Sequence, residues 1–160
     1  MQILKDLKQK KILITREFNA PLERVWQCWT TSNLLDEWWA PKPWKAKTTS
    51  MDFREGGRWN YAMVGPDGTE NYVRVDFISV VSNKSFTAYD VFCDDKGNVN
   101  NDLPGMEWKC EFTGTGSGTS VKVELTFATE ADLEKIVEMG FEEGFTSALG
   151  NLDELFELTT

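Results

Sequence analysis

The chain has 160 residues, the length of one domain, and roughly 70% of the surface of an unfolded chain of this length can be buried on folding. Lysine and arginine total 17 against 26 aspartate and glutamate residues, which gives a formal net charge of −9. This balance argues against nucleic acid and anionic membranes as partners, because both require a basic surface. We therefore expect residues 1–160 to form one acidic domain.

The N-terminal residues 1–9 carry charges every few positions and are expected to be loosely ordered. They lack the apolar stretch of a secretory signal, and no segment of the chain is apolar for long enough to span a membrane. We therefore expect a cytoplasmic protein. Residues 10–18 are rich in β-branched side chains and predict a strand. Two short helices are predicted next, over 21–30 and 32–40, and Pro41 ends the second.

From residue 44 to residue 127 apolar and polar side chains alternate, the period of a strand with one buried face. In residues 106–112, for example, Trp108 and Phe112 fall on one face and Lys109 on the other. The same pattern predicts antiparallel strands at 44–53, 56–64, 70–81, 85–92, 106–112 and 121–127. Turns rich in glycine or proline and one long polar loop connect them.

The last segment has the period of a helix. From Leu133 to Phe156 the large apolar side chains fall within one half of a helical wheel, which predicts a single amphipathic helix of about 25 residues. Gly140, Gly144 and Ala148 recur every four residues beside these side chains and predict a shallow groove in the buried face. Because only this helix is long enough to cover the sheet, we expect a wedge-shaped interior lined by aromatic residues.

Several segments resemble one known family, in the order in which the family has them. They are residues 15–41 ("TREFNAPLERVWQCWTTSNLLDEWWAP"), 52–59 ("DFREGGRW"), 65–68 ("GPDG") and 138–156 ("EMGFEEGFTSALGNLDELF"). The chain resembles the SRPBCC superfamily, and within it the family of the C-terminal domain of the activator of the heat-shock protein 90 ATPase. The resemblance implies an α+β helix-grip fold: a curved antiparallel sheet of about six or seven strands wrapped on a long C-terminal helix, with two short helices after the first strand.

Aromatic residues are the candidates for a binding site. Trp38, Trp39 and Trp44 crowd the junction of a short helix and a strand, where this fold type has its cavity mouth; core packing is the alternative for all three. The predicted cavity wall consists of Trp59, Tyr61, Met63, Trp108, Phe141, Gly144 and Phe145. Each is also explained by ordinary core packing. Among them, Tyr61 carries a hydroxyl group that can orient a ligand.

No motif predicts a catalytic residue, a cofactor or a metal site. The absence of histidine excludes Ser-His-Asp and Cys-His catalysis and histidine-based zinc sites. Residues 54–59 lack the spacing of a phosphate-binding loop, and residues 94–102 lack the ligand pattern of a calcium loop.

Three functions remain open. The leading hypothesis is a module, monomeric or homodimeric, that binds a hydrophobic or aromatic small molecule in an internal cavity. The second is a cyclase or aromatase that holds a reactive chain in that cavity, where proximity supplies part of the catalysis. The third, implied by the resemblance, is a co-chaperone-like domain that binds a protein partner in a stress response and stimulates a heat-shock ATPase.

Overall fold

The computed structural model describes residues 1–158 and is built on one eight-stranded sheet. The strands lie in the order β1–β2–β8–β7–β6–β5–β4–β3, and every neighbouring pair is antiparallel. Their bounds are β1 Gln2–Asp6, β2 Lys11–Phe18, β3 Lys45–Met51, β4 Arg58–Val64, β5 Glu70–Val81, β6 Ser85–Cys93, β7 Met106–Gly114 and β8 Thr119–Thr126.

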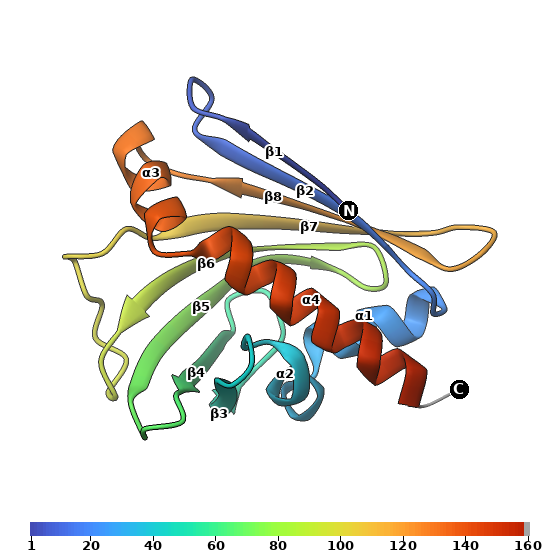
Figure 1. The fold of residues 1–160 in the computed structure, drawn as a ribbon, viewed down its shortest axis with the longest axis horizontal. Coiled ribbons are helices and arrows are strands. Elements are labelled where there is room, and N and C mark those ends of the chain that lie inside the picture. Colours follow the sequence, from blue (N-terminus) through green and yellow to red (C-terminus); the bar gives the residue numbers. More distant parts are fainter. Residues whose placement is uncertain (159–160) are drawn as a thin grey trace.

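Four helices accompany the sheet: α1 Leu22–Thr30, α2 Ser32–Trp38, α3 Glu130–Glu138 and α4 Phe141–Leu158. The last helix runs across the curved sheet, and α1 and α2 lie near its C-terminal end (Figure 1). This arrangement confirms the expected helix-grip α+β fold, with one or two more strands than predicted. One strand, β1, lies within residues 1–9, which were expected to be loosely ordered, and it pairs with β2 from Gln2↔Thr15 to Asp6↔Lys11.

The predicted alternation places the core between the sheet and α4. In β7 the side chains of Met106, Trp108, Cys110 and Phe112 are buried and those of Glu107 and Lys109 are exposed. In α4 the buried side chains are Phe145, Ala148, Leu149, Leu152 and Phe156. Polar contacts fix the helix at its C-terminal half: Asn151 Nδ2 donates to the carbonyl oxygen of Ala40 at 2.9 Å, and Asp153 pairs with Arg16 of β2.

The prediction of one continuous C-terminal helix is wrong, because the chain breaks at Gly140. This residue has φ +88°, a left-handed conformation that ends α3, and its N–H donates to the carbonyl oxygen of Val137 at 3.0 Å. Its own carbonyl oxygen then accepts from Gly144 N–H at 3.0 Å as α4 begins. Gly140 therefore forms the junction between α3 and α4 and is not part of a helical groove.

Gly140 and Gly150 differ in backbone conformation, so replacing each with alanine should change the stability of the protein in opposite directions. Gly140→Ala should lower the free energy of unfolding by about 1 kcal/mol, because a side chain at positive φ is strained. Gly150→Ala should raise it by about 1 kcal/mol, because Gly150 lies inside α4 with open space around it. Urea unfolding of both variants measures the pair. A stabilised Gly140→Ala variant would contradict the break in the helix.

Candidate functional site

A pocket of about 230 Å³ lies between the sheet and the junction of α3 and α4. The helices form one wall of the pocket, with Ile136, Met139, Gly140, Phe141, Gly144 and Phe145. Strands β4 to β7 form the opposite wall, with Tyr61, Met63, Val73, Asp90, Phe92, Met106 and Trp108, and the segment after α2 adds Trp39 and Pro41. Met139 is 46% exposed, so this side of the pocket reaches solvent.

Seven of the ten predicted site residues line this pocket: Trp39, Tyr61, Met63, Trp108, Phe141, Gly144 and Phe145. Their rings pack against one another. The Trp39 and Trp108 ring centroids are 5.6 Å apart, Phe145 lies 5.6 Å from Trp108, and Phe141 stacks on Phe145 at 5.4 Å. Gly144 faces Pro41, because a Cβ atom added to it would lie 3.7 Å from Pro41 Cγ.

The other three predicted residues are not in the pocket lining. Trp38 is 1% exposed and turns toward α1, where its Nε1 donates to the carbonyl oxygen of Cys28 at 2.9 Å. Trp44 packs against Gly65, at the turn that follows β4. Trp59 is buried two residues before Tyr61 on β4; its ring stacks on Tyr61 and its Nε1 donates to Thr48 Oγ1 at 3.0 Å. Of the predicted tryptophan portal, only Trp39 borders the pocket.

The interior is also fuller than the predicted wedge. Toward α1 and α2, Trp26 lies 5.1 Å from Phe112 and Trp29 lies 5.0 Å from Trp38, centroid to centroid. The void in this part of the interior measures about 20 Å³, which is room for about one water molecule. It lies between Trp29, Trp59 and Trp108. Among residues 1–158, the larger space between the sheet and the helices therefore lies beneath the α3–α4 junction.

Asp90 is the ionisable pocket residue that sequence reasoning missed, together with the apolar residues Pro41, Val73, Phe92, Met106, Ile136 and Met139. Asp90 lies on β6, is 8% exposed, and its Oδ2 accepts a hydrogen bond from Trp108 Nε1 at 3.1 Å. Burial raises the pKa of this carboxyl group to about 7, and the Trp108 hydrogen bond opposes part of that shift. Asp90 can therefore exchange a proton near neutral pH. The signal was present in the strand 85–92, where alternation puts Asp90 on the same face as Phe86 and Ala88.

Tyr61 is held as a neutral group in the same wall. Its hydroxyl oxygen accepts a hydrogen bond from Trp39 Nε1 at 2.8 Å. Burial and the nearby Asp90 raise the pKa of Tyr61 well above 10, so the phenol keeps its proton at pH 7. Tyr61 can thus orient a ligand or fix Trp39, but it cannot act as a base at neutral pH.

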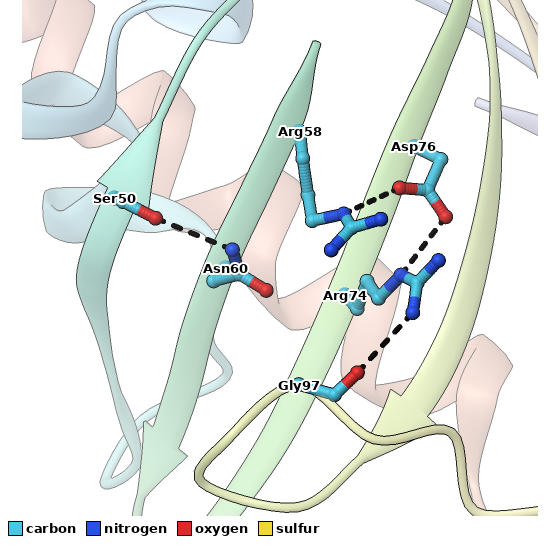
Figure 2. A network of polar contacts seen from close by, with 6 residues as sticks. All are labelled: Ser50, Arg58, Asn60, Arg74, Asp76 and Gly97. Atoms are coloured by element: carbon cyan, nitrogen blue, oxygen red, sulfur yellow. Dashed lines mark hydrogen bonds and ion pairs between the residues drawn. The ribbon is translucent and has the colours of Figure 1, made fainter. Parts of the chain in front are cut away.

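A second hollow, of about 190 Å³, lies over the polar faces of β4 and β5, where Arg58 and Asn60 alternate with the buried Trp59 and Tyr61. Figure 2 shows the polar network beside it: Arg58 and Arg74 both donate to Asp76, at 2.7 and 3.0 Å, and Arg74 also reaches the carbonyl oxygen of Gly97. These guanidinium groups already have anionic or carbonyl partners. The pocket beneath α3 and α4 is therefore the better candidate site.

No group of three potential metal ligands occurs among residues 1–158. Within the same residues, no helix combines the length and apolar character that crossing a membrane requires. The chemistry of the pocket thus consists of aromatic and aliphatic surface, one neutral phenol and one buried carboxyl group.

Comparison with known proteins gives a family match over most of the chain. A family model described as "Activator of Hsp90 ATPase homolog 1-like protein" matches residues 19–157. Among curated proteins, the comparison finds no match.

Solved structures from several bacteria are similar over nearly the full chain. A crystal structure of a protein from Mycobacterium smegmatis is 34% identical, covers 97% of this chain and 95% of that chain, and has a TM-score of 0.90. A solution structure from Arthrobacter aurescens is 30% identical, with 95% and 88% coverage and a TM-score of 0.90. One from Staphylococcus epidermidis is 28% identical, with 100% and 96% coverage and a TM-score of 0.86.

Proposed function

The chain belongs to the activator of Hsp90 ATPase homolog 1-like family, and from that premise we propose that it binds a small, mainly apolar molecule in the pocket beneath the α3–α4 junction. The observation that carries the proposal is a cavity of about 230 Å³ lined by six aromatic residues, three methionines and two glycines from the sheet and helix walls. An apolar cavity of about 150 Å³ is enough for benzene. A one-ring compound with a short side chain is therefore a suitable ligand.

The composition of the walls supports binding rather than packing alone. Small-molecule sites are usually concave and apolar, with a few polar groups that orient the ligand. Here Asp90 and the Tyr61 hydroxyl are those groups, and both lie on strands whose positions are fixed by the sheet. Gly144 keeps α4 free of a side chain where the helix borders the pocket.

A pair of glycine variants tests the proposal. Gly144→Leu adds a side chain at the pocket and should weaken binding of one-ring compounds at least about tenfold, because it fills the space that the ligand needs. Gly150→Leu adds the same side chain to α4 where there is open space, and should bind as the wild type does. Isothermal titration with a panel that includes 2-phenylethanol and 2-phenylethylamine measures both.

Two results would refute the proposed binding site. One is that no compound of the panel binds to the wild-type chain. The other is that Gly144→Leu and Gly150→Leu bind the panel equally well. The function suggested by the family's description, stimulation of a heat-shock ATPase through a protein partner, would then be the leading candidate. Exposed Glu130, Glu134 and Glu138 on α3 offer an acidic surface for such a partner.

A further inference from the structure

We propose that the pocket selects small hydrophobic amines, with the ammonium group bound by Asp90 and the apolar body held among the surrounding rings. The inference deepens the proposed function and rests on it. Three features of the described residues carry it: the free oxygen of a buried carboxyl group, the absence of basic side chains in the lining, and the number of aromatic rings around the space.

Asp90 has acceptor capacity that the protein leaves unused. Its side chain lies on the pocket wall beside Met106 of β7, to which it is paired in the sheet register, and is 8% exposed. Oδ2 accepts from Trp108 Nε1 at 3.1 Å. Within residues 1–158 the structure gives this carboxyl group no other hydrogen bond and no ion pair. A ligand that donates hydrogen bonds can therefore bind to Oδ1 without displacing a protein group.

The pocket lining contains an acidic group and no basic one, which favours a cationic ligand over an anionic ligand. No lysine or arginine lines this pocket, so a ligand carboxylate or phosphate would have no basic partner and would lie near Asp90. A carboxylate buried without a counterion is costly in an apolar site, and its pKa of about 7 reflects that cost. An ammonium ion compensates the charge, whereas a neutral hydroxyl group donates a hydrogen bond and leaves the charge unbalanced.

The rings add a second interaction with a cation. Trp39, Tyr61, Trp108, Phe141 and Phe145 all line the pocket. The negative face of an aromatic ring attracts an ammonium group within about 6 Å, and tryptophan does so most strongly. The same rings cover the apolar part of the ligand. The net charge of −9 further raises the local concentration of cations near the protein.

Three compounds with one scaffold and different charge test the inference on the full chain. They are 2-phenylethylamine, which is cationic at pH 7.5, the neutral 2-phenylethanol, and the anionic phenylacetate. Isothermal titration should rank the amine at least about tenfold tighter than the alcohol, because a hydrogen bond to a charged partner is the stronger kind. Phenylacetate should bind more weakly than the alcohol.

Asp90→Asn tests the role of the carboxyl group directly. The amide oxygen can still accept the Trp108 hydrogen bond, but the charge is lost. Affinity for the amine should fall at least about tenfold, and affinity for the alcohol should stay within about twofold. Asp76→Asn is the matched control, because it removes the same charge from the polar network on the other face of the sheet. It should leave the affinity for the amine unchanged.

The outcomes separate this inference from the proposed function. Equal affinities for the amine and the alcohol in the wild type, or an Asp90→Asn variant that binds the amine as well as the wild type, would overturn the selection of amines while the pocket remains a binding site. Absence of binding for all three compounds would overturn both. If Asp90→Asn does not fold, the ranking of the three compounds by the wild type decides alone.

Discussion

Asp90→Asn is expected to become more stable relative to the wild type as the pH rises, with the gap in unfolding free energy widening by about 3 kcal/mol between pH 5 and pH 8. The cause is the buried carboxyl group, whose pKa is about 7 in the folded protein and about 3.9 in an unfolded chain. Between these values the folded state binds more protons than the unfolded state. The stability of the wild type therefore falls with rising pH in this window.

The size of this change in stability follows from the difference between the folded and unfolded pKa values of Asp90. Each pKa unit corresponds to about 1.4 kcal/mol, so the penalty is small near pH 4, grows through pH 7 and is constant above it. Asparagine does not titrate and removes this contribution, while it keeps an acceptor for Trp108 Nε1. Urea unfolding of both proteins at pH 5, 6, 7 and 8 measures the gap.

Tyr61→Phe is the control for this pH dependence. It removes a polar group from the same wall, but the pKa of Tyr61 lies well above 10 and the phenol stays neutral throughout the window. The difference in unfolding free energy between Tyr61→Phe and the wild type should be the same at every pH from 5 to 8. If the Asp90→Asn gap were equally constant, Asp90 would not be a buried carboxyl group of the kind described.

The second large effect on stability is expected where α4 packs against the sheet. Leu152 is 0% exposed and belongs to the core cluster that also contains Leu149 and Phe156 of the same helix. Leu152→Ala should lower the free energy of unfolding by about 3 kcal/mol, because it removes buried methyl groups and leaves a cavity. Chemical unfolding with a fluorescence readout measures the loss.

Leu4→Ala provides the comparison, since it makes the same chemical change at a leucine of β1 that is 52% exposed. A loss below about 1 kcal/mol is expected there. Similar losses in the two variants would contradict the placement of α4 across the concave face of the sheet.

Alternation and helical period predict most of this fold, because they record which face of an element is buried. The strands β3 to β8 and the covering helix follow from them, and β2 follows from its β-branched side chains. The strand β1 does not, because four of its five residues are exposed and its pairing with β2 involves the backbone. The break at Gly140 is also invisible on a helical wheel, which places a residue by its number and not by its φ angle.

The residues of the candidate site were also predictable from the sequence only in part. Residues of the aromatic walls were predictable because large rings on the inner face of strands and on the buried side of α4 must meet. Trp38 could not be separated from Trp39 by sequence, because adjacent residues at the end of a helix point in different directions. Trp44 lies beyond α2, directly before β3, and the sequence does not show that its ring packs against Gly65. Asp90 could have been found by looking for polar residues on the buried face of a strand. A polar residue at an apolar position of an alternating strand marks a site more clearly than another aromatic ring.

The most direct measurement of the central claim is the tryptophan indole N–H spectrum during titration with 2-phenylethylamine. The Nε1–H groups of Trp39 and Trp108 donate to Tyr61 and Asp90 in the pocket wall, whereas that of Trp38 donates to Cys28 outside it. Saturable shifts of the Trp39 and Trp108 signals, with the Trp38 signal unmoved, are predicted. Binding of the amine that leaves the Trp39 and Trp108 signals in place would show that the ligand site is elsewhere.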